Sequence, residues 1–79
     1  MNEIITQIET VEYLKNSTMG NPRIKVNLII NGRVYTGRTA TDAPVGYALS
    51  VGRVYNNAKV RYHLTKSGAL IVDGVKFYD

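Results

Sequence analysis

One histidine and two neighbouring carboxylates are the residues whose chemistry could serve catalysis, and their positions do not favour it. His63 lies in an alternating run and should point away from its apolar side. A catalytic triad would need a nucleophile and an orienting carboxylate beside it, so we interpret His63 as a surface or loosely packed residue. Glu9 and Glu12 fall on opposite faces of a strand, which argues against an acid/base pair.

Two absences in the sequence point the same way. With no Cys, the chain can form no disulfide, thiolate nucleophile or Cys-based zinc site. Its seven Gly are scattered over predicted turns and form no phosphate-binding loop. We therefore expect a protein that is not an enzyme and that carries no metal or cofactor.

The aromatic and cationic side chains are more numerous, and they are of the types that bind ligands. Six Tyr and one Phe are interspersed with the cations, and nucleic-acid bases stack on aromatic rings while Lys and Arg contact phosphates. Alternation along the predicted strands suggests one basic, partly aromatic face. Its members are expected to be Arg23, Lys25, Arg33, Tyr35, Lys59, Arg61 and His63. The alternative is that these stems only cover a small twisted sheet.

The charge distribution supports an anionic partner. The net charge is +4, yet residues 13–66 hold nine cations and one anion, a net charge of +8, while the first twelve residues hold three Glu and no cation. Such a basic middle suits single-stranded nucleic acid or an anionic nucleotide. Equally, the acidic ends could pair with neighbouring strands and cancel part of the excess.

The segment between residues 16 and 22 is the most unusual loop. Asn16, Ser17 and Asn21 can satisfy their own turns, and Gly20 permits a positive φ angle. Loops of this length often carry function, so these four residues are candidate ligand contacts; a simple strand connection is the alternative.

The elements that must position these residues are mostly strands. Residues 24–30 alternate between apolar and polar, Asn31-Gly32 is typical of a type I′ turn, and residues 33–36 return as the partner strand. Residues 59–64 and 69–72 predict a second hairpin, with a bulge at Asp73-Gly74 before residues 75–77.

Two segments are less regular. β-branched residues dominate residues 3–15 and favour a long first strand, although a helix also fits the apolar spacing. Thr41 or Asp42 could cap a short helix with Pro44 in its first turn and Gly52 as its terminator.

This order predicts one mainly β domain over residues 1–79: a five-stranded antiparallel barrel or sheet with a short helix between strands three and four. This order of elements matches that of an oligonucleotide-binding (OB) barrel. An open sheet packed on one helix would have the same order and is the alternative.

A pattern in small uncharacterised proteins of bacteriophages and mobile elements resembles part of this sequence: Asn16-Ser17-Thr18-Met19-Gly20-Asn21-Pro22-Arg23, then Tyr35, Thr39, Thr41-Asp42-Ala43 and Tyr47. The resemblance spans about residues 16–50 and implies an accessory protein, with no activity to transfer. It adds a second function class, a counter-defence or host-takeover inhibitor that binds a host protein or sequesters a signalling nucleotide. A homo-oligomer paired through an edge strand is a third. Without a signal sequence or an apolar span, we expect a cytoplasmic protein with no membrane partner.

Overall fold

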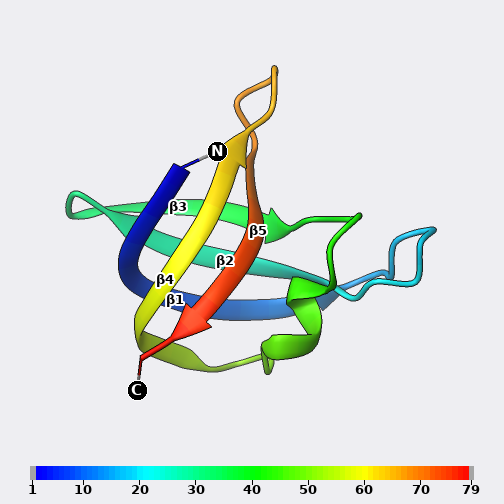
Figure 1. Ribbon diagram of the computed structural model, residues 1–79, viewed down its shortest axis with the longest axis horizontal. Coiled ribbons are helices and arrows are strands. Elements are labelled where there is room, and N and C mark those ends of the chain that lie inside the picture. The colour runs from blue at the N-terminus through cyan, green and yellow to red at the C-terminus, as the bar shows by residue number, and fades with distance from the viewer. Residues whose placement is uncertain (1, 79) are drawn as a thin grey trace.

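The computed structural model describes residues 2–78 and consists of five strands and one 3₁₀ helix (Figure 1). The elements are β1 (Asn2–Leu14), β2 (Arg23–Ile30), β3 (Arg33–Thr39), η1 (Pro44–Ala48), β4 (Val54–Leu64) and β5 (Leu70–Phe77). The mainly β prediction is confirmed. Among these residues, none lies in a helix that is long and apolar enough to span a membrane.

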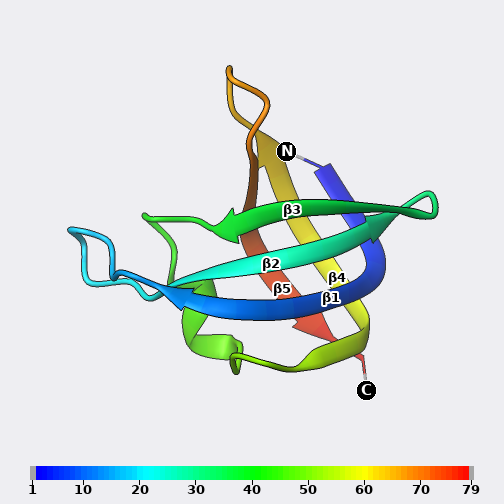
Figure 2. The same cartoon turned by 180° about the vertical axis from the view of Figure 1, so that it is seen from behind.

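The sheet closes on itself in the order β1-β2-β3-β5-β4, with β4 pairing back onto β1. All neighbours are antiparallel except β3 and β5, which pair in parallel over three residues. In Figure 2, β1, β2 and β3 cross in front of β4 and β5. The strand order is OB-like, as predicted. Because β4 pairs with β1, the sheet is closed, and of the two predicted alternatives the barrel is the correct one.

β1 is one long strand, so the helical alternative for residues 3–15 is wrong. It pairs with both β2 and β4, and its register shifts between Thr6 and Ile8 against β4 and between Thr10 and Glu12 against β2. Such irregularities bend a strand, which lets β1 curve from one partner to the other.

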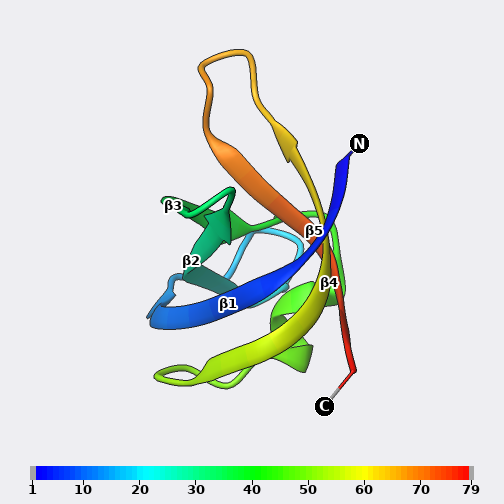
Figure 3. The ribbon, with the colours of Figure 1, turned by 90° about the vertical axis from the view of Figure 1, so that its left-hand side faces the viewer.

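The two predicted hairpins are present. Asn31 and Gly32 have φ angles of 52° and 78°, as a type I′ turn requires, and β2 alternates between buried and half-buried residues. In the β4–β5 hairpin, Arg61 pairs with Gly74 and Tyr62 with Val72, which leaves Asp73 as the extra residue of a bulge. The turn of this hairpin projects from the barrel (Figure 3).

The apolar core lies inside the ring and draws on β1, β2, β4 and β5, while β3 contributes the fully buried Thr39. Its fully buried side chains include Ile8, Val26, Leu28, Val60 and Val72. These residues are the inward positions of alternating strands, so each strand keeps its opposite face for solvent.

The predicted helix is only partly correct. The segment Pro44–Ala48 is a single 3₁₀ turn whose N-cap is Ala43 without a side-chain hydrogen bond, so neither Thr41 nor Asp42 caps it, and it ends before Gly52. Five residues are too few for an α-helix to gain from its hydrogen bonds. Gly46 also packs against the Pro22 carbonyl so closely that a Cβ atom would overlap it.

Candidate functional site

The seven predicted surface residues do not form one surface. Across the two-residue turn, Arg33 pairs with Ile30 and Tyr35 pairs with Leu28. Paired residues share a face, so Arg33 and Tyr35 lie on the side of the core residues, opposite to the side of Lys25. The two-residue turn determines which face Arg33 and Tyr35 occupy, because its length fixes the register of the whole hairpin.

Lys25 and His63 do lie in one outward row of the barrel. The pairs Lys25 with Arg38, Arg38 with Ile71, and Ile71 with His63 connect them. Sequence reasoning left Arg38 out of the predicted surface. In this row Glu12 lies 4.0 Å from Lys25 and Asp73 lies 2.6 Å from the Nδ1 atom of His63, while Arg38 is in no ion pair among the described residues.

Asp73 therefore gives His63 the orienting carboxylate that the sequence did not suggest. The carboxylate is 13% exposed and the imidazole 44%. Within residues 2–78, no hydroxyl group is hydrogen-bonded to the His63 ring, and no three His, Asp or Glu side chains gather as a metal site. The geometry is that of an ion pair or hydrogen bond joining β4 to β5.

The outer face of β1 and β2 carries more carboxylate than expected. The shift at Val11 puts Glu9 opposite Asn27 and Glu12 opposite Lys25, so both Glu point outward and the prediction of opposite faces is wrong. Asn27 donates to Glu9 over 3.1 Å and accepts from Thr36 over 2.8 Å. This face of an OB-like barrel often binds oligonucleotides, but here its polar groups bond to each other.

The loop residues predicted as ligand contacts mainly hold the loop in place. The Ser17 hydroxyl and the Asn21 amide both donate to the Thr41 carbonyl oxygen, over 2.9 and 2.8 Å. The Tyr47 hydroxyl donates to the Gly20 carbonyl oxygen over 3.1 Å, and Asn16 accepts from the Tyr13 hydroxyl. These hydrogen bonds join the loop to the β3–η1 connection and to η1.

Arg23 follows this loop and is only partly exposed. Its Nε atom is buried and has no hydrogen-bond partner among the described residues. Its position opposite Leu14 separates it from the cations of β4.

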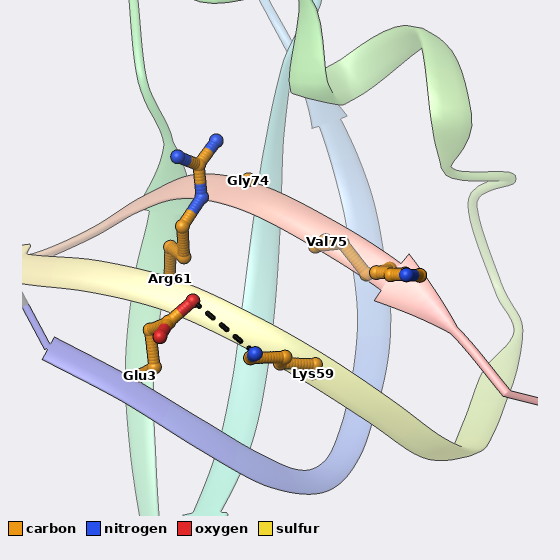
Figure 4. Close-up of a pocket in the computed structure, with 6 residues that line it drawn as sticks. Glu3, Lys59, Arg61, Gly74 and Val75 are labelled. Atoms are coloured by element: carbon orange, nitrogen blue, oxygen red, sulfur yellow. Dashed lines mark ion pairs between the residues drawn. The ribbon is translucent and has the colours of Figure 1, made fainter.

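A basic cluster of Lys59, Arg61 and Lys76 lies on the outer face of β4 and β5. Lys59 is paired directly with Lys76, and Arg61 with Gly74. Together with Glu3 and Val75, these residues line an open depression of about 320 Å³ (Figure 4). Sequence reasoning included Lys59 and Arg61 but missed Lys76, because the β4–β5 register depends on the bulge.

One carboxylate offsets this cluster. Glu3 on β1 lies 3.7 Å from the Nζ atom of Lys59, and the pair is drawn in Figure 4. Like charges directly opposite each other destabilise a sheet. Glu3 therefore offsets part of the repulsion between Lys59 and Lys76.

Gly74 leaves the space in which the Arg61 guanidinium lies. The Arg61 guanidinium lies over Gly74, where a Cβ atom would sit 2.5 Å from Nη2 and 2.8 Å from Nε. The bulge also leaves Asp73 engaged by His63, and no ion pair joins Asp73 to Arg61 within the described chain. On the other side of Arg61, Glu3 of β1 is directly opposite it and lines the same depression.

An aromatic ring borders the cluster. The Nζ atom of Lys76 lies 5.8 Å from the centre of the Tyr78 ring, and Tyr78 is 49% exposed. The cluster therefore combines three cations with an accessible aromatic surface, which is the composition of a single-strand binding platform.

Comparison with known proteins gives no match: no family model, no curated protein and no solved structure matches this chain. The OB-like description consequently rests on strand order and pairing alone, and the candidate site on its geometry.

Proposed function

We propose that this protein binds single-stranded nucleic acid through the basic cluster of Lys59, Arg61 and Lys76. The observation that carries the proposal is the Lys59–Lys76 pair, two cations directly opposite each other, with Arg61 beside them and a single carboxylate, Glu3, in the depression. Lys25 and Arg38 are also directly opposite each other, with Glu12 4.0 Å from Lys25; we prefer the cluster because its three cations line one depression.

The shape of the site favours a strand over a free nucleotide. The depression is open along two strands and does not enclose a ligand, and Tyr78 lies at its border. A chain of phosphates can contact the three cations in turn while one base stacks on the ring. Such binding depends on charge and stacking, so we expect little sequence preference.

Fluorescence anisotropy with a labelled single strand tests the proposal. Three phosphate contacts predict that log K falls with log salt with a slope of about −2, or roughly 20-fold weaker binding at 200 mM than at 50 mM salt. No binding at 50 mM salt, or an affinity that salt does not change, would contradict it. A mononucleotide competing as well as the strand on a molar basis would assign the site to nucleotides instead.

Two variants of equal charge locate the site. Arg61→Ala should weaken strand binding about tenfold and flatten the salt slope by about 0.7, because one phosphate contact is lost. Arg33→Ala is the matched control, since Arg33 lies at the β2–β3 turn, away from the cluster. Equal losses in both variants would mean that only the overall charge matters.

A further inference from the structure

A second pocket lies on the outer face of the barrel, where β3 pairs with β5. It has a volume of about 240 Å³, and its walls come from β3, the β3–η1 connection, β4 and β5. The outward row that runs through β3, β5 and β4 crosses it. The lining residues that matter here are Arg38, Ala40, Asp42, His63 and Ile71.

The floor of this pocket is apolar. Ile71 and Ala40 are only 7% and 2% exposed, although neither belongs to the apolar core inside the ring. Ile71 pairs with Arg38 on one side and with His63 on the other, so these two side chains flank it. An apolar floor between a few polar groups is typical of ligand pockets and suits a flat ring.

Two groups of opposite charge line the walls. The side chains of Arg38 and Asp42 are exposed, and within residues 2–78 neither forms an ion pair. Asp73 is hydrogen-bonded to the Nδ1 atom of His63 over 2.6 Å and thereby holds the imidazole in place. A guanidinium only donates and a carboxylate only accepts, so the pocket suits a neutral ligand with acceptors on one edge and donors on another.

Among the nucleobases, guanine has this combination of edges. Its O6 and N7 atoms accept two N–H groups of a guanidinium, and its N1–H and N2–H groups donate to the two oxygens of a carboxylate. Adenine presents one acceptor and one donor where guanine presents two acceptors. Cytosine offers a carboxylate one amino group, and thymine offers none.

The outer face of β4 and β5 connects this pocket to the basic cluster. Arg61 and His63 are two residues apart in β4, so both lie on its outer face, about 6.6 Å apart along the strand. A further depression of about 210 Å³ shares Arg61 and Gly74 with that of the cluster, and its Asp73 is the residue hydrogen-bonded to His63. A strand that contacts the cluster therefore reaches the pocket along one face, without crossing the core.

We propose that this pocket binds one guanine base of the single strand whose phosphates contact the basic cluster. Arg38 donates to O6 and N7, Asp42 accepts from N1–H and N2–H, and Ile71 packs against the ring. The inference rests on the proposed function. It adds a preference at one position to a binding that the cluster makes without reading sequence.

A labelled thymidine strand with one central base replaced tests the inference by fluorescence anisotropy. Replacement by guanine should tighten binding about tenfold at an unchanged number of phosphates, because two bidentate contacts form. Replacement by 7-deazaguanine, which lacks N7, or by hypoxanthine, which lacks the N2 amino group, should give much less of this gain.

Equal affinities of the thymidine and guanine strands would overturn the guanine pocket and leave the proposed function standing. An equal gain with adenine would likewise overturn it. No binding of any of these strands would overturn both proposals.

Variants at the two charged walls locate the pocket. Arg38→Lys keeps the charge but loses the fork of N–H groups, so the preference for guanine should fall to about twofold while thymidine binding stays the same. Arg33→Lys, at the β2–β3 turn, is the matched control and should keep the full preference. Asp42→Ala should lower the ratio of guanine to thymidine affinity as well. A ratio that Arg38→Lys leaves unchanged, with unchanged circular dichroism, would contradict the inference.

Discussion

At the scale of single residues, the missing side chain of Gly74 determines where the Arg61 guanidinium lies. A methyl group at position 74 would meet only the flexible end of the Arg61 side chain, with Nη2 2.5 Å away. Gly74→Ala should therefore displace the guanidinium from the cluster and cost little stability. We expect strand affinity to fall about threefold to tenfold in anisotropy, with a change of only a few degrees in Tm. A large loss of Tm with unchanged affinity would show that Gly74 serves folding alone.

A buried hydroxyl holds the connection that enters β4. Thr10 is 1% exposed; its Oγ1 atom donates to the Ser50 carbonyl oxygen and accepts the Arg53 N–H over 3.0 Å. Thr10→Val keeps the shape but leaves these backbone groups unpaired, so we expect a loss of about 1–3 kcal/mol in the free energy of unfolding. Urea denaturation measures it. Thr36→Val, an exposed change of the same chemistry, is the control and should change stability little.

At the scale of the elements, the sequence correctly predicted the features that depend on neighbouring residues alone, such as hairpins and the bulge. Alternation in residues 24–30 and the Asn31-Gly32 turn identified the first hairpin, and Asp73-Gly74 identified the bulge. The faces of the site were predicted less well. Arg33 and Tyr35 were assigned without the register of the turn, and Lys76 joined Lys59 only through a pairing that the bulge shifts.

Other differences come from contacts between distant segments. The helix signal at Pro44 was real, yet the packing of Gly46 on Pro22 and the short segment limit it to one 3₁₀ turn. The shift at Val11, which turns Glu12 outward, arises from β1 bending between two partners. Local propensity does not contain either of these tertiary constraints.

The closure of the ring depends on one close approach. At Gly37 a Cβ atom would overlap the Leu70 side chain and lie 2.5 Å from the Leu70 carbonyl oxygen, where β3 pairs with β5 over only three residues. Gly37→Ala should therefore force the strands apart and cost about 1–3 kcal/mol. For a domain of this size, that predicts a fall in Tm of roughly 5–20 °C by circular dichroism. An unchanged Tm would mean that the β3–β5 contact is not needed for closure, and Gly74→Ala serves as the comparison with a flexible neighbour.

At the scale of the whole molecule, the positive charge is uneven. Carboxylates of β1 lie within 4.0 Å of Lys25 and Lys59, so part of the charge on those two residues is compensated locally. The other Lys and Arg side chains of the described residues are in no ion pair, and two of them, Arg61 and Lys76, lie on the outer face of β4 and β5 with Lys59 directly opposite Lys76. Such a distribution favours one orientation of a polyanion on the barrel.

Because strand pairing brings Lys59, Arg61 and Lys76 together only in the folded chain, a single strand bound there should stabilise folding. A ligand at about 100 times its Kd adds about 2.7 kcal/mol when it binds only the folded chain. For a small domain this predicts a rise in Tm of roughly 10–20 °C, and Arg61→Ala should reduce the rise while Arg33→Ala should preserve it. Thermal unfolding by circular dichroism at low and high salt measures both. A single strand that leaves Tm unchanged, or that lowers it by binding the unfolded cationic chain, would show that the folded cluster is not the binding site.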